Sequence, residues 1–361
     1  MSDYQAFIKT LAAPLVVLCL LLGGCLLPQK AGAAWRFQLG PDLPGEFYSV
    51  GEYVPSLGLI PTGQYGGGRI AGIDPVTLDY RILGHLPVGR GHESVSAFQL
   101  IDGGAGINAW TESDSGAQCW TAWRNQGWVW RLTQSFSPWP WSLAGPSAAS
   151  RGWMALSEGR PRRDYGSVLM QWAAQGNDRW EPITPTIPGL VVWDAVSWRD
   201  GKLLGCSLGN GEYLDEWAGR LVWVRGQEWR LLNLPAMAGV LRIYRFDSWP
   251  DRLWVSTTWG EVWYTDNPFS DDWVLWHRED YGKQRNAFVF ERAGALAVAG
   301  ARGGLWHYPR ADAAGELVAQ VPDTLFMSLS PVDLPDNRWC LAGPLTLRGA
   351  RNSRTVGFYL K

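Results

Sequence analysis

Residues 240–279 read VLRIYRFDSWPDRLWVSTTWGEVWYTDNPFSDDWVLWHRE, and this stretch decides the fold. Residues 241–246 alternate apolar and polar side chains with a period of two, which is typical of a β-strand. Further short strands are predicted at 253–256, 261–264 and 273–276. Residues 249–251 and 266–268 contain Pro, Asp and Asn, which favour tight turns. The stretch therefore predicts four consecutive antiparallel strands joined by short connections.

The same order of strands and turns recurs from Trp35 to the last residue with a period of about 47 residues, which is typical of a propeller or an array. Of the 361 residues 24 are Trp, several times the ordinary usage, and many lie in the recurring apolar runs. Third strands are predicted at 69–73, 120–124, 168–173, 221–224, 261–264, 305–308 and 356–360. First hairpin turns are predicted at 55–56, 102–103, 200–201, 250–251, 293–294 and 336–337, with one more within 145–152.

Fourth strands are one fewer than third strands. They are predicted at 80–83, 128–132, 180–183, 229–232, 273–276 and 316–321. The missing strand lies at the other end of the chain, because residues 35–44 resemble the segments that begin at Tyr80 and Trp229. We therefore expect residues 35–39 to pair with residues 356–360 and to remove the open sheet edges. The prediction is an all-β, seven-bladed β-propeller of four-stranded antiparallel blades, which is one domain over residues 35–361.

Most Trp residues are predicted to pack between blades, because large flat rings fill the space between sheets. Trp128, Trp180, Trp229 and Trp273 are assigned to equivalent positions of successive blades. Only Trp residues in loops are candidates for binding.

Two short segments resemble known propeller hairpins. Residues 266–273, DNPFSDDW, resemble a degenerate Asp-box, and residues 177–180 do so more weakly. The chain thus resembles the β-propeller superfamily, with Asp-box-like, Trp-rich blades. Sialidases share the Asp-box but use an arginine triad, which cannot be placed here. The resemblance therefore implies the fold and transfers no catalytic residue.

The N-terminal 34 residues are predicted to be a targeting segment rather than part of the fold. An apolar run at 11–27 follows Lys9 and is short for a membrane-spanning helix. Residues 22–25, LGGC, resemble a bacterial lipobox that ends in a lipidated Cys25. Residues 31–33, AGA, fit a signal-peptidase site instead, and an uncleaved anchor is the third alternative. All three predict export. The lipobox predicts a lipid-anchored protein in the periplasm or on the cell surface.

Composition bounds the remaining possibilities. With 46% hydrophobic and 18% charged residues and a net charge of -2, the chain is neither disordered nor typical of a nucleic-acid-binding protein. Cys119, Cys206 and Cys340 are predicted to be separate, buried thiols. The four His residues lack the spacing of metal ligands, and no cofactor motif is present.

Candidate ligand contacts lie in loops that join second to third strands, where propellers usually bind. These loops bring carboxylates, arginines and aromatic rings to one face. The candidates are Tyr65, Glu112, Asp114, Arg162, Arg163, Asp164, Tyr165, Glu212, Tyr213, Asp215, Trp217, Trp259, Glu261 and Arg302. Solvated hairpin loops whose charges offset one another would have the same composition.

The sequence favours a cell-envelope binding or scaffold module that presents this face to a protein or glycan partner. The alternative is a carbohydrate-active hydrolase or lyase, which needs two carboxylates roughly 5–10 Å apart. A structural assembly protein of a phage or secretion apparatus is a further alternative. Fold alone does not choose among them.

Overall fold

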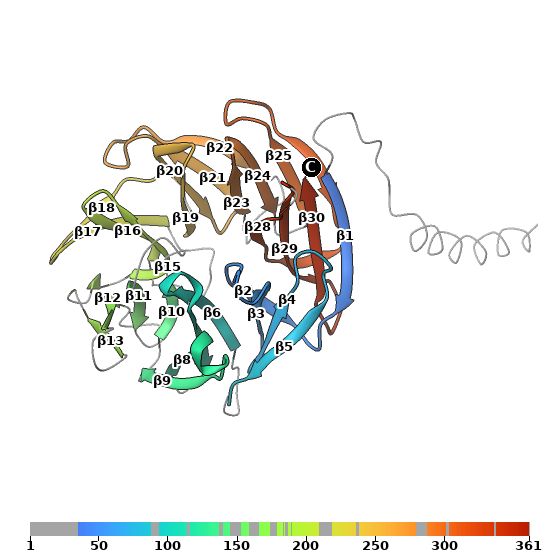
Figure 1. Cartoon of the computed structure of the whole chain (residues 1–361). Coiled ribbons are helices and arrows are strands. Elements are labelled where there is room, and N and C mark those ends of the chain that lie inside the picture. Colours follow the sequence, from blue (N-terminus) through green and yellow to red (C-terminus); the bar gives the residue numbers. More distant parts are fainter. Residues whose placement is uncertain are drawn as a thin grey trace, which may run out of the picture.

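The protein forms a ring of antiparallel β-sheets around a common centre (Figure 1). The computed structural model describes residues 35–360 apart from internal segments, namely 88–93, 114–115, 137–139, 145–152, 159–165, 174–178, 183, 185–186, 189, 209–218, 236–237, 279–286, 301–302 and 336. Two short 3-10 helices, η1 (Asp102–Gly104) and η2 (Arg124–Gln126), lie in turns. In the described residues no helix has the length and apolar character needed to cross a membrane.

Each sheet consists of strands that follow one another in the chain. The sheets in the first half are β2 (Phe47–Val50), β3 (Ile60–Gln64), β4 (Arg69–Ile73) and β5 (Tyr80–His85); β6 (Ser94–Ile101), β7 (Gly106–Ser113), β8 (Gly116–Trp123) and β9 (Arg131–Phe136); and β10 (Pro140–Ala144), β11 (Trp153–Glu158), β12 (Gly166–Ala173) and β13 (Arg179–Pro182), with β14 (Ile187–Pro188) also on β12.

The sheets in the second half follow the same order. They are β15 (Leu190–Trp198), β16 (Gly201–Leu208), β17 (Gly219–Arg225) and β18 (Glu228–Leu232); β19 (Val240–Phe246), β20 (Trp249–Thr257), β21 (Glu261–Thr265) and β22 (Val274–Arg278); and β23 (Ala287–Arg292), β24 (Ala295–Gly300), β25 (Gly304–Tyr308) and β26 (Glu316–Gln320). The closing sheet contains β27 (Thr324–Met327) and β28 (Ser330–Asp333), which both pair with β29 (Trp339–Leu347), then β30 (Arg354–Leu360) and β1 (Trp35–Asp42).

This arrangement is an all-β propeller with four-stranded antiparallel blades. The first strand of each sheet lies nearest the centre of the ring, and the fourth lies at the periphery (Figure 1). We call β2, β6, β10, β15, β19, β23 and β27 the inner strands. We call β1, β5, β9, β13, β18, β22 and β26 the outer strands.

The two ends of the chain close the ring as predicted. β1 pairs antiparallel with β30, in a register that joins Trp35 to Leu360 and Leu39 to Val356. The N-terminal strand is therefore the outer strand of the C-terminal sheet, and the two lie side by side in Figure 1. Thr355 Oγ1 donates to the Leu78 carbonyl at 2.8 Å and thereby ties the closing sheet to the next one.

The hydrophobic core lies between neighbouring sheets rather than within one. In one cluster Trp254 and Val262 of one sheet pack with Ala287, Val289 and Val298 of the next. Trp254 is fully buried, and its ring lies 4.9 Å from those of both Tyr264 and Trp276. The prediction that aromatic rings fill the space between sheets is confirmed for this position.

The same prediction is wrong for Trp229, which is 44% exposed on the outer strand β18. Blades diverge towards the periphery, so the neighbouring sheet is too far away to cover this ring. The predicted equivalence of four Trp residues also fails in part. Trp180 and Trp229 are second residues of their strands, but Trp273 precedes β22 and Trp128 lies in a turn before β9.

The predicted boundaries differ from the observed ones most of all at two places. The predicted strand 128–132 begins at Arg131, because Gly127 and Trp128 have positive φ angles of 69° and 60° and prolong the turn. Pro250 and Asp251 were expected in a turn but belong to β20, and the turn lies at residues 247–248. The predicted hairpin within 145–152 lies outside the described residues, as does Asp336 of the last predicted turn.

The prediction of three separate, buried thiols is confirmed. Cys119, Cys206 and Cys340 are free and buried. Burial raises the pKa of the Cys206 thiol above its ordinary value and that of Cys340 to about 12, so both stay protonated. They act as small apolar core residues.

Candidate functional site

The loops between second and third strands lie on the same face as the connections between blades. The Tyr65 amide donates to the Glu46 carbonyl at 2.8 Å, and the Thr258 amide donates to the Gly239 carbonyl at 2.9 Å. In the closing sheet the Arg348 amide donates to the Asp323 carbonyl at 2.7 Å. Each bond joins a loop between strands to the connection that precedes its sheet. Backbone bonds thus fix the described parts of the predicted face, which we call the loop face.

Only part of the predicted set can be located on this face. The side chains of Tyr65, Trp259 and Glu261 are described. The backbone of Glu112 belongs to β7, but its side chain lies outside the described part. The remaining candidates lie outside the described residues: Asp114, Arg162, Arg163, Asp164, Tyr165, Glu212, Tyr213, Asp215, Trp217 and Arg302.

Tyr65 belongs to a small aromatic cluster on the loop face. Its ring lies 5.0 Å from that of Tyr48, the second residue of the inner strand β2. Tyr65 is 51% exposed. The Tyr48 hydroxyl donates to Glu46 Oε2 at 3.5 Å. Burial, with a smaller effect of Glu46, raises the pKa of Tyr48 above its ordinary value, so the Tyr48 phenol is neutral at physiological pH. The cluster offers a ring held in place and open to a partner.

Glu261 is not an exposed loop carboxylate. It is the first residue of β21 and is only 6% exposed. Its Oε2 accepts a bond from the Trp263 indole at 3.0 Å, and its Oε1 pairs with the Arg278 guanidinium. Both carboxylate oxygens are therefore engaged, one within β21 and the other in a bond that joins β21 to β22. Trp259 lies two residues before it and is partly buried.

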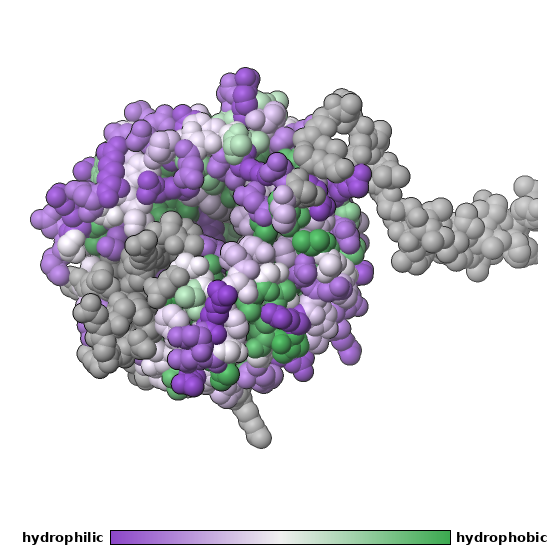
Figure 2. All heavy atoms as spheres, viewed as in Figure 1, coloured by the Kyte–Doolittle hydropathy of each residue, from purple (hydrophilic) through white to green (hydrophobic). Residues whose placement is uncertain are grey.

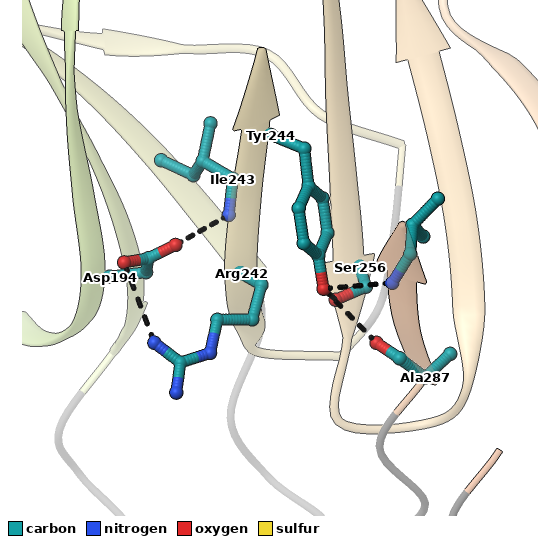
Figure 3. Close-up of polar contacts among 7 residues, drawn as sticks. Asp194, Arg242, Ile243, Tyr244, Ser256 and Ala287 are labelled. Carbon is teal, nitrogen blue, oxygen red and sulfur yellow. Dashed lines mark hydrogen bonds and ion pairs between the residues drawn. The ribbon is translucent and has the colours of Figure 1, made fainter. Parts of the chain in front are cut away.

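A buried charged group lies at the inner end of this region, on inner strands (Figure 3). Asp194 of β15 is 5% exposed, and its Oδ2 accepts the Ile243 amide of β19 at 2.7 Å. Its Oδ1 lies 3.7 Å from the Arg242 guanidinium, whose side chain is 46% exposed. Burial raises the pKa of Asp194 to about 6, and Arg242 opposes that shift. The long ion pair compensates the buried charge only in part, and within the described part of the chain Arg242 forms no second ion pair.

Tyr244 repeats this arrangement one blade further on (Figure 3). Its hydroxyl accepts the Val289 amide of the inner strand β23 at 3.2 Å and lies 3.5 Å from Ser256 Oγ and from the Ala287 carbonyl. Burial raises the pKa of Tyr244 to about 12. An inner strand has one edge without a partner strand, and these side chains satisfy its amides from the neighbouring blade.

β-Bulges set this geometry. The register shifts occur between Phe47 and Ser49 in β2, Val95 and Ala97 in β6, Val192 and Asp194 in β15, and Val240 and Arg242 in β19. A bulge re-aims the side chains that follow it. Ser49, in the position equivalent to Asp194, donates from Oγ to the Val95 carbonyl of the next inner strand at 2.6 Å.

Sequence reasoning missed this set, although one indication was present. Asp194 is the lone charged residue in the apolar run 190–196, and a charge in a buried strand requires a partner. The partner could not be named, because the bulge decides which residue of the next blade lies opposite.

A separate open groove of about 470 Å³ lies beside the outer strand β18. Arg220, Leu231 and Leu234 line it, and Asn233 donates to Asp271 there at 2.9 Å. None of the predicted residues contributes to it. In the part of the chain that is described, no three His, Cys, Asp or Glu residues form a group that could hold a metal ion.

Fold and site together define a β-propeller in which backbone bonds tie the described segments of the loop face to one another. No family model matches the chain, and no curated protein matches it. Two solved structures share the fold. One is titled "YCF48 bound to D1 peptide", with a TM-score of 0.54, 11% identity, and coverage of 92% of this chain and 98% of that one. The other is Raptor of Chaetomium thermophilum, with a TM-score of 0.58, 13% identity, and coverage of 91% of this chain. This chain spans 29% of the Raptor chain. At these identities the likeness concerns the fold alone.

Proposed function

We propose that this protein is a binding module that holds a protein partner on its loop face, next to the inner ends of the blades. The observation that carries the proposal is Arg242. Its exposed guanidinium is oriented by the buried Asp194, and among the described residues it has no other ion-pair partner. Tyr65 adds a fixed, exposed ring on the same face. Preorganised arginine and tyrosine side chains are typical anchors of protein interfaces.

The neighbour YCF48 supports a protein partner in general, because its structure carries a bound peptide. Figure 2 shows the surface hollowed near the centre of the ring, where a peptide segment would have walls on several sides. The proposal treats residues 35–361 as one domain and each sheet as one blade, which makes seven blades. It also includes export, with Cys25 lipidated in a periplasmic or surface location.

The alternative of a carbohydrate-active enzyme gains no support from the described residues. Glu261 is the one candidate carboxylate whose side chain is described, and Arg278 and Trp263 occupy its oxygens. A general acid or nucleophile needs an oxygen free to reach the substrate.

Site-specific photo-cross-linking tests the binding proposal. A benzoylphenylalanine in place of Tyr65 is expected to yield one dominant protein adduct in intact cells. The same probe in place of Val274, which is 46% exposed on β22, is expected to yield none. Arg242→Gln should lower the adduct yield about tenfold, because a hydrogen bond to a charged group contributes about 1.5–3 kcal/mol.

Arg310→Gln is the matched control, because Arg310 is exposed and lies in the turn between β25 and β26, away from the loop face. Equal adducts at the two probe positions, or an equal effect of the two arginine variants, would refute the binding face. An adduct between copies of the chain would favour the structural assembly alternative. Loss of fatty-acid labelling in Cys25→Ser, with release from the membrane fraction, tests the anchor separately.

A further inference from the structure

An exposed arginine lies on the inner strands near the loop face. The charged residues of the inner strands are Asp194, Arg242, Arg245, Glu291 and Arg292. The last three lie near the ends of β19 and β23 that lead into hairpins away from the loop face. Asp194 is buried, whereas the Arg242 side chain is 46% exposed. Arg242 is therefore the charge that the described inner strands present to a partner on the loop face.

Asp194 determines where this guanidinium lies (Figure 3). Its Oδ2 accepts the amide of Ile243, the residue that follows Arg242, at 2.7 Å, and this bond fixes the carboxylate against β19. Its Oδ1 lies 3.7 Å from an Arg242 nitrogen, which is longer than a hydrogen bond. The planar guanidinium can bind a second carboxylate through two parallel N–H donors. The pair thus positions Arg242 for an acidic group of a partner.

A carboxylate bound to Arg242 would be the second one beside the same guanidinium. When like charges share a site, the pKa of one of them rises. Asp194 is the group that responds, because burial already raises its pKa to about 6, whereas an exposed Asp or Glu titrates near about 4. Oδ1 can take the proton while Oδ2 keeps the Ile243 amide bond. Geometry alone therefore sets the sign: binding of a carboxylate favours protonation of Asp194.

The groups that face Asp194 leave this coupling to Arg242. From β19, Arg242 and Tyr244 act on it, but burial raises the pKa of Tyr244 to about 12, so that phenol stays neutral. On β16 the residue opposite Asp194 is Gly205. β10, β11 and β12 also contact β15, and by residue type their charge is Glu158, the last residue of β11. Its side chain lies outside the described part.

We propose that Arg242 receives a carboxylate from an acidic segment of the protein partner, and that Asp194 takes up a proton from the solvent as this carboxylate binds. The inference rests on the proposed function and names the chemistry of its partner. Proton uptake removes the repulsion between the two carboxylates and leaves the guanidinium to the partner. Because binding takes up a proton, lower pH strengthens it until the carboxylates of the partner are themselves protonated.

Binding of a defined peptide at several pH values tests the inference. The probe is a short blocked peptide of alternating Leu and Glu, and the same peptide with Gln in place of Glu is its neutral isostere. The protein is purified in a non-ionic detergent, and the anisotropy of a rhodamine label gives each Kd between pH 5.5 and 8, where Glu side chains are ionised. Arg242→Gln removes the receptor, and Asp194→Asn removes the titrating group. Arg245→Gln is the matched control, because Arg245 is on the same strand but donates to the Ser197 carbonyl.

We expect the Glu peptide to bind about tenfold more tightly than its isostere at pH 5.5, and Arg242→Gln to abolish that difference. The Kd of the Glu peptide should rise about fivefold from pH 5.5 to 8 in the wild type and in Arg245→Gln, and should stay constant in Asp194→Asn. Binding of neither peptide, an equal Kd for both, or a Kd that falls as the pH rises would overturn the proposal.

Cross-linking at Tyr65 reports on the proposed function independently of this peptide. A protein adduct at Tyr65 without any preference for the acidic peptide would leave the binding face in place and remove only the present inference. Loss of the Tyr65 adduct would remove the proposed function itself.

Discussion

The inner and outer strands of the same blades differ in which side chains they bury. At the inner ends, the polar side chains of Asp194 and Tyr244 are buried and bonded to the neighbouring blade. On the outer strands, apolar side chains such as Ile82 and Leu231 are about half exposed. The geometry of a ring explains the difference, because neighbouring blades touch at the centre and diverge at the periphery.

The comparison shows that the repeat alone does not decide the role of a residue. Trp254 and Trp229 both lie in apolar runs of adjacent sheets, on the second strand β20 and on the outer strand β18, yet one is fully buried and the other 44% exposed. Their distance from the centre of the ring determines which one contacts the next blade. Stability should therefore depend on inner positions, and surface interactions on outer ones.

The largest expected effect on the free energy of unfolding comes from removing a Trp ring that packs between two sheets, compared with removing one at the periphery. Trp254→Ala should lower the free energy of unfolding by about 3–5 kcal/mol, because it removes a ring packed between two sheets. Trp229→Ala should change it by no more than about 0.5–1 kcal/mol. Urea titrations followed by far-ultraviolet circular dichroism measure both. Similar losses for the two variants would show that the periphery is as tightly packed as the centre.

The next effect concerns the charge of Asp194. Its pKa in the folded protein is about 6, above the ordinary value, so the folded state holds the proton more tightly than the unfolded state. The ionised carboxylate therefore costs stability above pH 6, and the cost disappears as the pH falls towards 4. A difference of about two pKa units corresponds to about 3 kcal/mol as an upper limit.

Asp194→Asn should accordingly stabilise the protein by about 2–3 kcal/mol at pH 8 and by almost nothing at pH 4. Asn can still accept the Ile243 amide. Chemical unfolding at several pH values gives the comparison. Arg242 and Tyr244 are the titratable groups that act on Asp194 from β19, and Arg242→Gln should enlarge the benefit of the substitution. A variant that is destabilised at every pH would mean that the ion pair outweighs burial.

His277 changes the free energy of unfolding with pH in the direction opposite to Asp194. It is buried on the outer strand β22, its Nδ1 lies 2.6 Å from the Tyr308 hydroxyl, and burial lowers its pKa to about 4. Because the unfolded state takes up this proton first, the group destabilises the fold as the pH falls from about 6.5 to 4. A measured pH profile of the wild type therefore combines opposing contributions, and the difference between wild type and Asp194→Asn isolates one of them.

The closing of the ring could be predicted from sequence, because the repeat leaves one fourth strand missing and residues 35–39 supply it. Cys burial could be predicted for a similar reason, since an apolar strand position is buried in any blade. The Asp194–Ile243 bond could not, because it depends on a bulge in β15 and on the register of a neighbouring blade. The exposure of Trp229 depends on how far its strand lies from the centre of the ring, and a repeat in the sequence does not report that distance.

The smallest expected effect tests whether inner polar groups tie blades together. Tyr244→Phe removes the hydroxyl that accepts the Val289 amide and leaves that buried amide without its partner. The free energy of unfolding should fall by about 1–2 kcal/mol. Tyr65→Phe is the matched control, because Tyr65 is 51% exposed and its loss should stay within about 0.5 kcal/mol. An equal response of the two tyrosines would mean that water replaces the hydroxyl at the inner edge of β23, and that packing alone holds adjacent blades together.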